Sequence, residues 1–205
     1  MIRTKPSKQV AGWAAALALA VSLVAACSDD NAQTASEPKP EETTASASGP
    51  AAQTFGPACS AIPKSGAGSF NGMATQPVAT AASGNPLLKT LVAAVTKADL
   101  GDTLNSADAL TVFAPTDEAF AKIPKADLDA VLADKAKLTQ ILTHHVVAGE
   151  LDPSDIGGEH KTLNKDSITV DGDESGMTVD GAKVLCGNIP TDNATVYVID
   201  TVLMP

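Results

Sequence analysis

The chain has 205 residues, which is enough for an export signal and one ordinary domain. Its formal net charge is −10, and only 3% of its residues are aromatic. An acidic chain repels phosphate backbones, which argues against nucleic acid as a partner, and the scarcity of aromatic residues predicts a mainly aliphatic core.

The N-terminus has the features of a secretory signal. A short basic segment precedes an apolar run at 10–24, which is shorter than the roughly 20 apolar residues that a membrane span needs. Residues 24–27, Val-Ala-Ala-Cys, resemble the bacterial lipobox, in which cleavage falls just before a lipid-bearing cysteine. We therefore predict a cleaved signal peptide at 1–26 and acylation of Cys27, because several acyl chains on one terminus anchor stably. The alternative is an ordinary signal peptide that happens to contain a cysteine.

A polar stretch follows the predicted anchor. Residues 27–54 are rich in Ser, Thr, Ala, Glu and Pro and contain almost no large apolar residue. Because such a stretch cannot bury enough surface to offset its ordering entropy, we predict an extended stalk. Thr43 and Thr44 have the surroundings of an O-glycosylated stalk. An unmodified linker is the alternative.

Two cysteines remain once Cys27 is assigned to lipid. An exported protein with two such residues, Cys59 and Cys186, most simply forms one disulfide. A metal pair or a redox pair is the alternative, but neither cysteine has a Cys-x-x-Cys spacing. The predicted bond ties an approach segment at 55–73 to a domain at 74–205.

Helical patterns dominate the first part of this domain. Asn85-Pro86 predicts a helix start, and apolar residues then recur on one face until Gly101. The run 110–114 is typical of a buried strand that is stopped by a proline. Thr116 can cap the next short helix, and Asp117 suits the positive end of that helix.

The rest of the domain changes from helices to strands. Two further helices are expected around 128–132 and after Asp134 as a cap. Asp180-Gly181 predicts a hairpin turn between strands. Residues rich in β-branched side chains predict strands at 167–170, 177–179, 182–189 and 194–203. Helices followed by antiparallel strands indicate an α+β fold.

Three motifs resemble those of fasciclin-type domains. Residues 111–120 (TVFAPTDEAF) look like the first signature box, and residues 196–205 (VYVIDTVLMP) look like the second. Residues 141–149 resemble the central Tyr-His segment, with His144 in place of the tyrosine. The resemblance implies a two-sheet β-wedge with a helical layer, acting in adhesion without a cofactor. With the lipobox and the cysteine pair, residues 55–205 also resemble the single-fasciclin-domain lipoproteins and secreted antigens of mycobacteria.

Histidines are the first candidates for site chemistry. His145 lies on the apolar stripe of its helix, where a histidine is more often a core residue with a hydrogen-bond partner than a ligand. We expect Thr116 or Asp117 to be that partner. His144 is rotated about 100° from His145 on a helix, so the two cannot readily share one metal ion. These four residues are candidate structural or partner-binding residues, and no metal site is predicted.

Three other patterns suggest binding sites that the residues do not complete. Residues 171–176 match the front half of a calcium loop, but Ala182 stands where the loop needs glutamate, so we expect a hairpin turn. Asn188-Ile189 takes the place of the Asp-Ile pair of integrin-binding animal domains and lacks the carboxylate that would ligate the metal. No phosphate-loop signature follows the glycines of the approach segment, so we expect flexible punctuation at Gly56, Gly66, Gly68 and Gly72.

The predicted function follows from export, anchoring and the resemblance. We predict no enzyme, no catalytic residue and no cofactor, because no Gly-x-Ser-x-Gly, His-Glu-x-x-His or Cys-x-x-Cys motif occurs. The leading hypothesis is a lipoprotein on the outer face of the cell membrane, with shedding as a further fate. It would mediate adhesion or recognition of an unidentified host-surface, matrix or envelope partner. The alternatives are an envelope small-ligand carrier or enzyme, which would have a deep cavity with converging polar groups, and a passive structural protein.

Overall fold

The computed structural model describes residues 49–205, so the predicted signal peptide, Cys27, Thr43 and Thr44 lie outside the described residues. The helices of the described part are α1 (Phe70–Met73), α2 (Val78–Gly84), α3 (Lys89–Lys97), α4 (Gly101–Asn105), α5 (Asp117–Ala121), α6 (Lys125–Ala133) and α7 (Lys135–His144), after a 3-10 turn, η1 (Pro57–Ala61). The strands are β1 (Leu110–Pro115), β2 (Val146–Ala148), β3 (Gly158–Lys161), β4 (Ser167–Asp171), β5 (Thr178–Val179), β6 (Ala182–Pro190) and β7 (Ala194–Ile199). The α+β class predicted from the sequence is confirmed.

The strands form one hydrogen-bonded sheet in the order β2-β1-β7-β6-β5-β4-β3. Every neighbouring pair is antiparallel except β1 and β7, which run parallel with Val112 opposite Val196. This pairing sets the strand parts of the two signature boxes side by side. The sequence predicted antiparallel strands only, because a long-range parallel pair leaves no local turn signal.

The sheet folds over itself at β6. This strand pairs with β7 along one part and with β5 along another, and its register against β7 shifts on both sides of Cys186. An isolated bridge between Val147 and Thr162 joins the far ends of the sheet, beside β2 and β3. The two sheets expected from the family resemblance are therefore two halves of one sheet that share a long, irregular strand.

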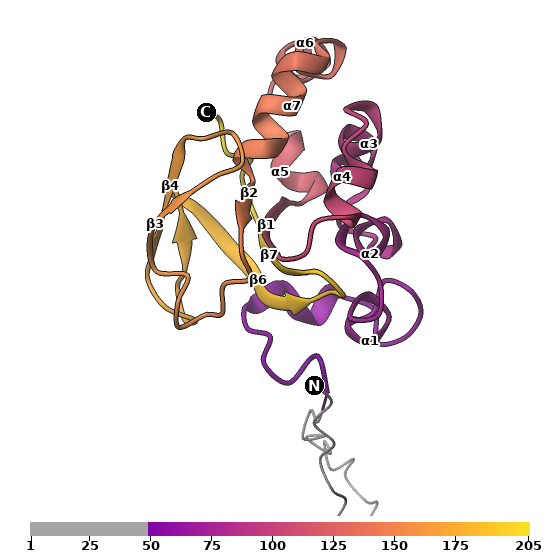
Figure 1. Ribbon diagram of the computed structural model, residues 1–205, viewed down its shortest axis with the longest axis vertical. Helices are drawn as coiled ribbons and strands as arrows, with labels where there is room; N and C mark the ends of the chain where they lie inside the picture. The colour runs from indigo at the N-terminus through magenta and orange to yellow at the C-terminus, as the bar shows by residue number, and fades with distance from the viewer. Residues whose placement is uncertain (1–48) are drawn as a thin grey trace, which may run out of the picture. The chain divides into compact units, whose positions relative to one another are not determined.

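The two faces of this sheet bury two separate cores. The helices pack on one face, over aliphatic residues such as Val112 and Val196 (Figure 1). The folded sheet encloses the second core, which includes Phe113 and Tyr197. Since successive residues of a strand point to opposite faces, β1 serves both cores and is buried along its whole length. The predicted aliphatic character holds for the helical core, where Phe120 is the one buried aromatic residue among those described.

Local capping was predicted correctly at two helices and wrongly at a third. The Thr116 hydroxyl accepts a hydrogen bond from the Ala119 N–H at 3.2 Å and so caps α5. The Asp134 carboxylate likewise caps α7. The helix predicted to start at Asn85 begins instead at Lys89, because the Asn85 side chain closes a local turn by accepting from the Leu87 N–H.

Some of the other local predictions were also correct, and others were wrong. The Asp180-Gly181 turn joins β5 to β6 as predicted, with both residues at positive φ. Gly101 follows α3 but also opens α4, so the chain resumes a helix there. The strand expected at 194–203 ends at Ile199. Strands β2 and β3 were missed, since both are short and β3 is mostly exposed.

The approach segment is held firmly to the sheet. The predicted Cys59–Cys186 disulfide is present, and Phe55 forms a backbone bridge to Gly187. The expectation of flexible punctuation is wrong at Gly68, where any Cβ would collide with the Gly84 carbonyl oxygen. Here the glycine permits a close approach of two backbone segments.

Candidate functional site

The central motif places His145 directly after the last residue of α7, in contact with the C-terminal segment. Its Nε2 accepts a hydrogen bond from the Leu203 N–H at 3.0 Å, and its Nδ1 lies 2.8 Å from the Ile141 carbonyl oxygen. The Nδ1–H therefore donates to Ile141, which defines the tautomer. The expected partners, Thr116 and Asp117, are not the actual ones, because each is engaged in capping a helix.

Burial determines the protonation state of His145. The side chain is buried, and desolvation lowers its pKa from 6.5 to about 4. The hydrogen bond to Ile141 opposes this shift, whereas the neighbouring His144 adds to it. The imidazole is thus neutral at neutral pH and joins two backbone segments, as expected for a core histidine.

Asp117 acts on a helix other than its own. Its carboxylate accepts a hydrogen bond from the Thr90 N–H at 2.7 Å, in the first turn of α3. Its own N–H donates to the Leu87 carbonyl oxygen at 3.0 Å. The first signature box therefore supplies the N-terminal cap of α3, which explains why no local cap was found there.

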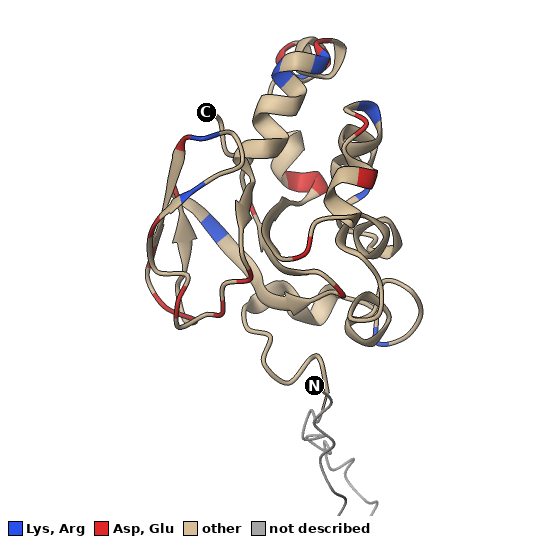
Figure 2. Ribbon diagram, in the orientation of Figure 1, with Lys and Arg blue, Asp and Glu red and all other residues tan. Residues whose placement is uncertain are grey.

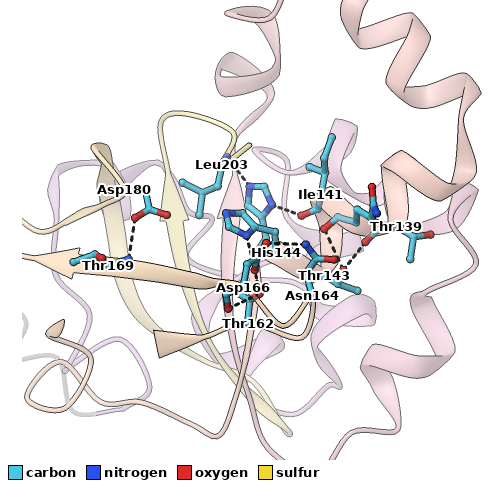
Figure 3. Close-up of polar contacts among 12 residues, drawn as sticks. Thr139, Ile141, Thr143, His144, Thr162, Asn164, Asp166, Thr169, Asp180 and Leu203 are labelled. Atoms are coloured by element: carbon cyan, nitrogen blue, oxygen red, sulfur yellow. Dashed lines mark hydrogen bonds and ion pairs between the residues drawn. The ribbon is translucent and has the colours of Figure 1, made fainter. Parts of the chain in front are cut away.

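His144 faces the turn between β3 and β4 (Figure 3). Its Nδ1 lies 2.8 Å from a carboxylate oxygen of Asp166, while the histidine itself is buried. The Thr162 hydroxyl and the Asn164 amide also donate to this carboxylate. Burial would raise the pKa of Asp166, but these hydrogen bonds outweigh it and lower the pKa to about 2. The contact joins the end of α7 to the turn between β3 and β4.

The third histidine lies apart from this pair. His160 Nε2 is 2.7 Å from the Ile156 carbonyl oxygen. Within residues 49–205, no three His, Cys, Asp or Glu side chains are grouped so as to hold a metal ion.

The residues that the sequence identified as incomplete binding patterns serve local structure. Asp173 accepts from the Ser175 N–H within the β4–β5 loop, and the buried Asn188 donates to the Gln53 carbonyl oxygen.

A cavity of about 270 Å³ lies between α2, α3 and α4 on one side and β1 and α7 on the other. We call it the helical cavity. Its lining is mostly aliphatic, and it had no signal in the sequence because five separate segments contribute to it. The residues that line it are Val78, Ala79, Thr80, Ala82, Ser83, Leu91, Val92, Val95, Thr96, Gly101, Asp102, Leu104, Asn105, Val112, Phe113, Leu142, His145 and Val146.

The outer surface carries charges of both signs (Figure 2). Basic and acidic residues lie together around α6 and the start of α7, where Lys135 pairs with Asp99 and Lys137 lies 3.9 Å from Asp134 (Figure 2). Acidic residues are also spread over β3, β4 and the loops around these strands. None of the helices within 49–205 is both long and apolar enough to cross a membrane.

The fold and the paired signature boxes define the class of protein. The family model of the Fasciclin domain matches residues 86–205, and the chain belongs to this family. Over 219 aligned residues it is 42% identical to "Cell surface glycolipoprotein MPB83" of Mycobacterium bovis, covering 100% of this chain and 97% of that protein. It is 45% identical over 163 residues to "Immunogenic protein MPB70" of the same species, covering 76% and 84% of the two chains.

A solved structure is also similar. It is the FAS1 domain pair from the insect cell adhesion molecule Fasciclin I, at 26% identity and a TM-score of 0.48. The similar region covers 57% of this chain and 45% of the insect chain.

Proposed function

We propose that this protein is a lipid-anchored cell-surface protein whose fasciclin domain mediates adhesion or recognition. The observation that carries the proposal is the end-to-end similarity to a protein named cell surface glycolipoprotein, which includes the segment around Cys27. Membership of the Fasciclin family agrees with this proposal.

The geometry favours binding by the outer surface. Thr116, His144 and His145 are buried, and Asp117 is occupied in capping α3. These motif residues therefore hold the domain together, and a partner meets the loops and helices around them. A non-catalytic role agrees with this arrangement, because both nitrogens of His145 are engaged by backbone groups.

Anchoring is tested at Cys27. A C27A variant cannot take a thioether lipid, so it should move from the membrane to the medium, and the wild-type protein should partition into the detergent phase. The matched control is S28A, which leaves the acceptor cysteine intact and should remain in the membrane. Intact mass gives the direct readout: an unmodified Cys27 on the wild-type protein would refute the anchor. The same mass spectra test the stalk. Hexose increments on the wild-type protein that are absent from the T43A/T44A variant would show glycosylation at these threonines.

Adhesion is tested with the anchor in place. Cells that display the whole protein are compared with cells that display only residues 27–54 on the same anchor. We expect attachment to host cells, matrix or neighbouring envelope to fall when the domain is absent. Equal attachment of the two strains, at equal surface levels, would favour the passive structural role instead.

A further inference from the structure

The lining of the helical cavity is mainly apolar, so it suits hydrocarbon rather than polar groups. Its floor is formed by core residues such as Leu91, Val112 and Leu142, all buried. Val92 and Val95 of α3 line its wall and are only partly buried, so apolar surface remains open on the solvent side. Protein interiors seldom leave voids larger than a water molecule, which makes an apolar space of this size unusual.

Most polar groups around the cavity are already hydrogen-bonded within the protein. The Asn105 amide accepts from the Ala79 N–H and donates to the Thr80 hydroxyl. The Thr96 hydroxyl donates to the Val92 carbonyl oxygen. His145 uses both ring nitrogens on backbone groups. An occupant gains little by hydrogen bonding here, so apolar contact must supply its affinity.

Size and shape narrow the occupant further. The helical cavity has a volume of about 270 Å³. It falls just below the range of about 300–1,000 Å³ that is usual for drug-sized ligands. Phe113 is the one aromatic residue of the lining, and its ring lies in the second core against Tyr197, so the walls are mainly aliphatic. A single unbranched hydrocarbon chain fits this lining better than a planar aromatic molecule does.

Charge selects the head group of that chain. Asp102 is exposed at the cavity, and the lining contains no lysine or arginine. A carboxylate or phosphate beside Asp102 would meet repulsion with no compensating cation. A neutral head group, such as an alcohol or an ester, avoids this cost.

From these observations we infer that the helical cavity is a binding site for one unbranched aliphatic chain with an uncharged head group. This inference is independent of the adhesion proposal, since it rests on the cavity alone. It gives the domain a second capacity, the binding of a neutral lipid chain at the cell surface.

The test uses the mature chain with C27A, so that no anchor lipid competes for the cavity. Decan-1-ol is titrated by calorimetry and by NMR of the methyl groups, with decanoate as the charged counterpart. We expect saturable binding of one decan-1-ol per chain, at least fivefold weaker binding of decanoate, and contacts from the decanol methylenes to the methyl groups of Leu91, Val95 and Leu142.

Two tryptophan variants locate the site. V95W fills the cavity from α3 and should weaken decan-1-ol binding at least tenfold. L163W adds the same side chain at an exposed position of the β3–β4 turn and should bind like the parent. If V95W does not fold, A82L fills the cavity with fewer atoms and serves in its place. Absence of saturable binding, equal affinity in the filled variant, or methyl contacts elsewhere would each overturn the inference.

Discussion

The Nε2 of His145 accepts a hydrogen bond from the backbone N–H of Leu203, across 58 residues of sequence. This bond fastens the end of the second signature box to the end of α7, while Nδ1 of the same ring holds the last turn of that helix. Only the neutral imidazole has the lone pair that this geometry needs. Protonation of His145 must therefore break the link between the two segments.

The free energy of unfolding is expected to fall as the pH drops from 6.5 towards 4. The pKa of His145 is about 4 in the folded state and 6.5 in the unfolded state, so the unfolded state binds the extra proton in this window. The full stability is present above pH 6.5 and is lost at about 1.4 kcal/mol per pH unit, to a total of about 3 kcal/mol. Urea unfolding at several pH values between 4.5 and 7.5 measures this slope.

A variant without a titrating group isolates the contribution of His145. H145Q should be less stable at pH 7 but should lose most of the slope between pH 6.5 and 4.5. The lowered pKa of Asp166, about 2, places its own loss of stability below pH 3.8, outside this window. Equal slopes for H145Q and the wild type would contradict the assignment, as would an NMR titration of the His145 ring with a midpoint near 6.5.

The carboxylate of Asp117 should stabilise α3, although it belongs to α5. Replacing it with alanine leaves the Thr90 N–H without its acceptor, so D117A should lower the free energy of unfolding by about 1–2 kcal/mol. E118A is the matched control: Glu118 is the next residue, is exposed and lies in the same first turn of α5. Its loss should cost under about 0.5 kcal/mol. A similar loss in both variants would point to a general charge effect at α5.

His145 and Asp117 show which features of the structure the sequence could predict and which it could not. The caps at Thr116 and Asp134 were predictable, because cap and helix are adjacent in the chain. The start of α3 was not, because its cap comes from Asp117, 27 residues away from Thr90. The burial of His145 followed from helical spacing, whereas its partner Leu203 depends on how distant segments pack. Local chemistry determines the type of an element, and tertiary contacts determine its limits.

The same distinction applies to the remaining site features. The motif boxes were sufficient to identify the family, but the contact between His144 and Asp166 needs the β3–β4 turn to fold against α7. Strand β3 was missed because its residues are mostly exposed and polar. The helical cavity was also missed, because five separate segments line it and none of them alone carries a sequence signal for it.

Gly68 should tolerate no larger residue, in contrast to Gly101. A methyl group at Gly68 would collide with the backbone carbonyl of Gly84, which cannot move independently of α2. We expect G68A to cost about 1–3 kcal/mol, the usual range for an overpacked site. G101A meets no neighbouring atom and restricts the unfolded chain, so it should be neutral or stabilising by up to about 1 kcal/mol. Thermal and urea unfolding of both variants measure the difference, and equal effects would refute the close approach.

Removing the disulfide should weaken the domain without changing its fold. The Cys59–Cys186 bond closes a loop across 127 residues, and the chain-entropy model gives about 4–5 kcal/mol as an upper limit for such a loop. C59A/C186A should therefore show a lower urea midpoint with a similar circular dichroism spectrum, because Phe55 still bridges Gly187. A reducing agent should shift the wild-type midpoint towards that of the variant and leave the variant unchanged. If reduction leaves the wild type as stable as before, the bond does not constrain the unfolded chain as the model requires.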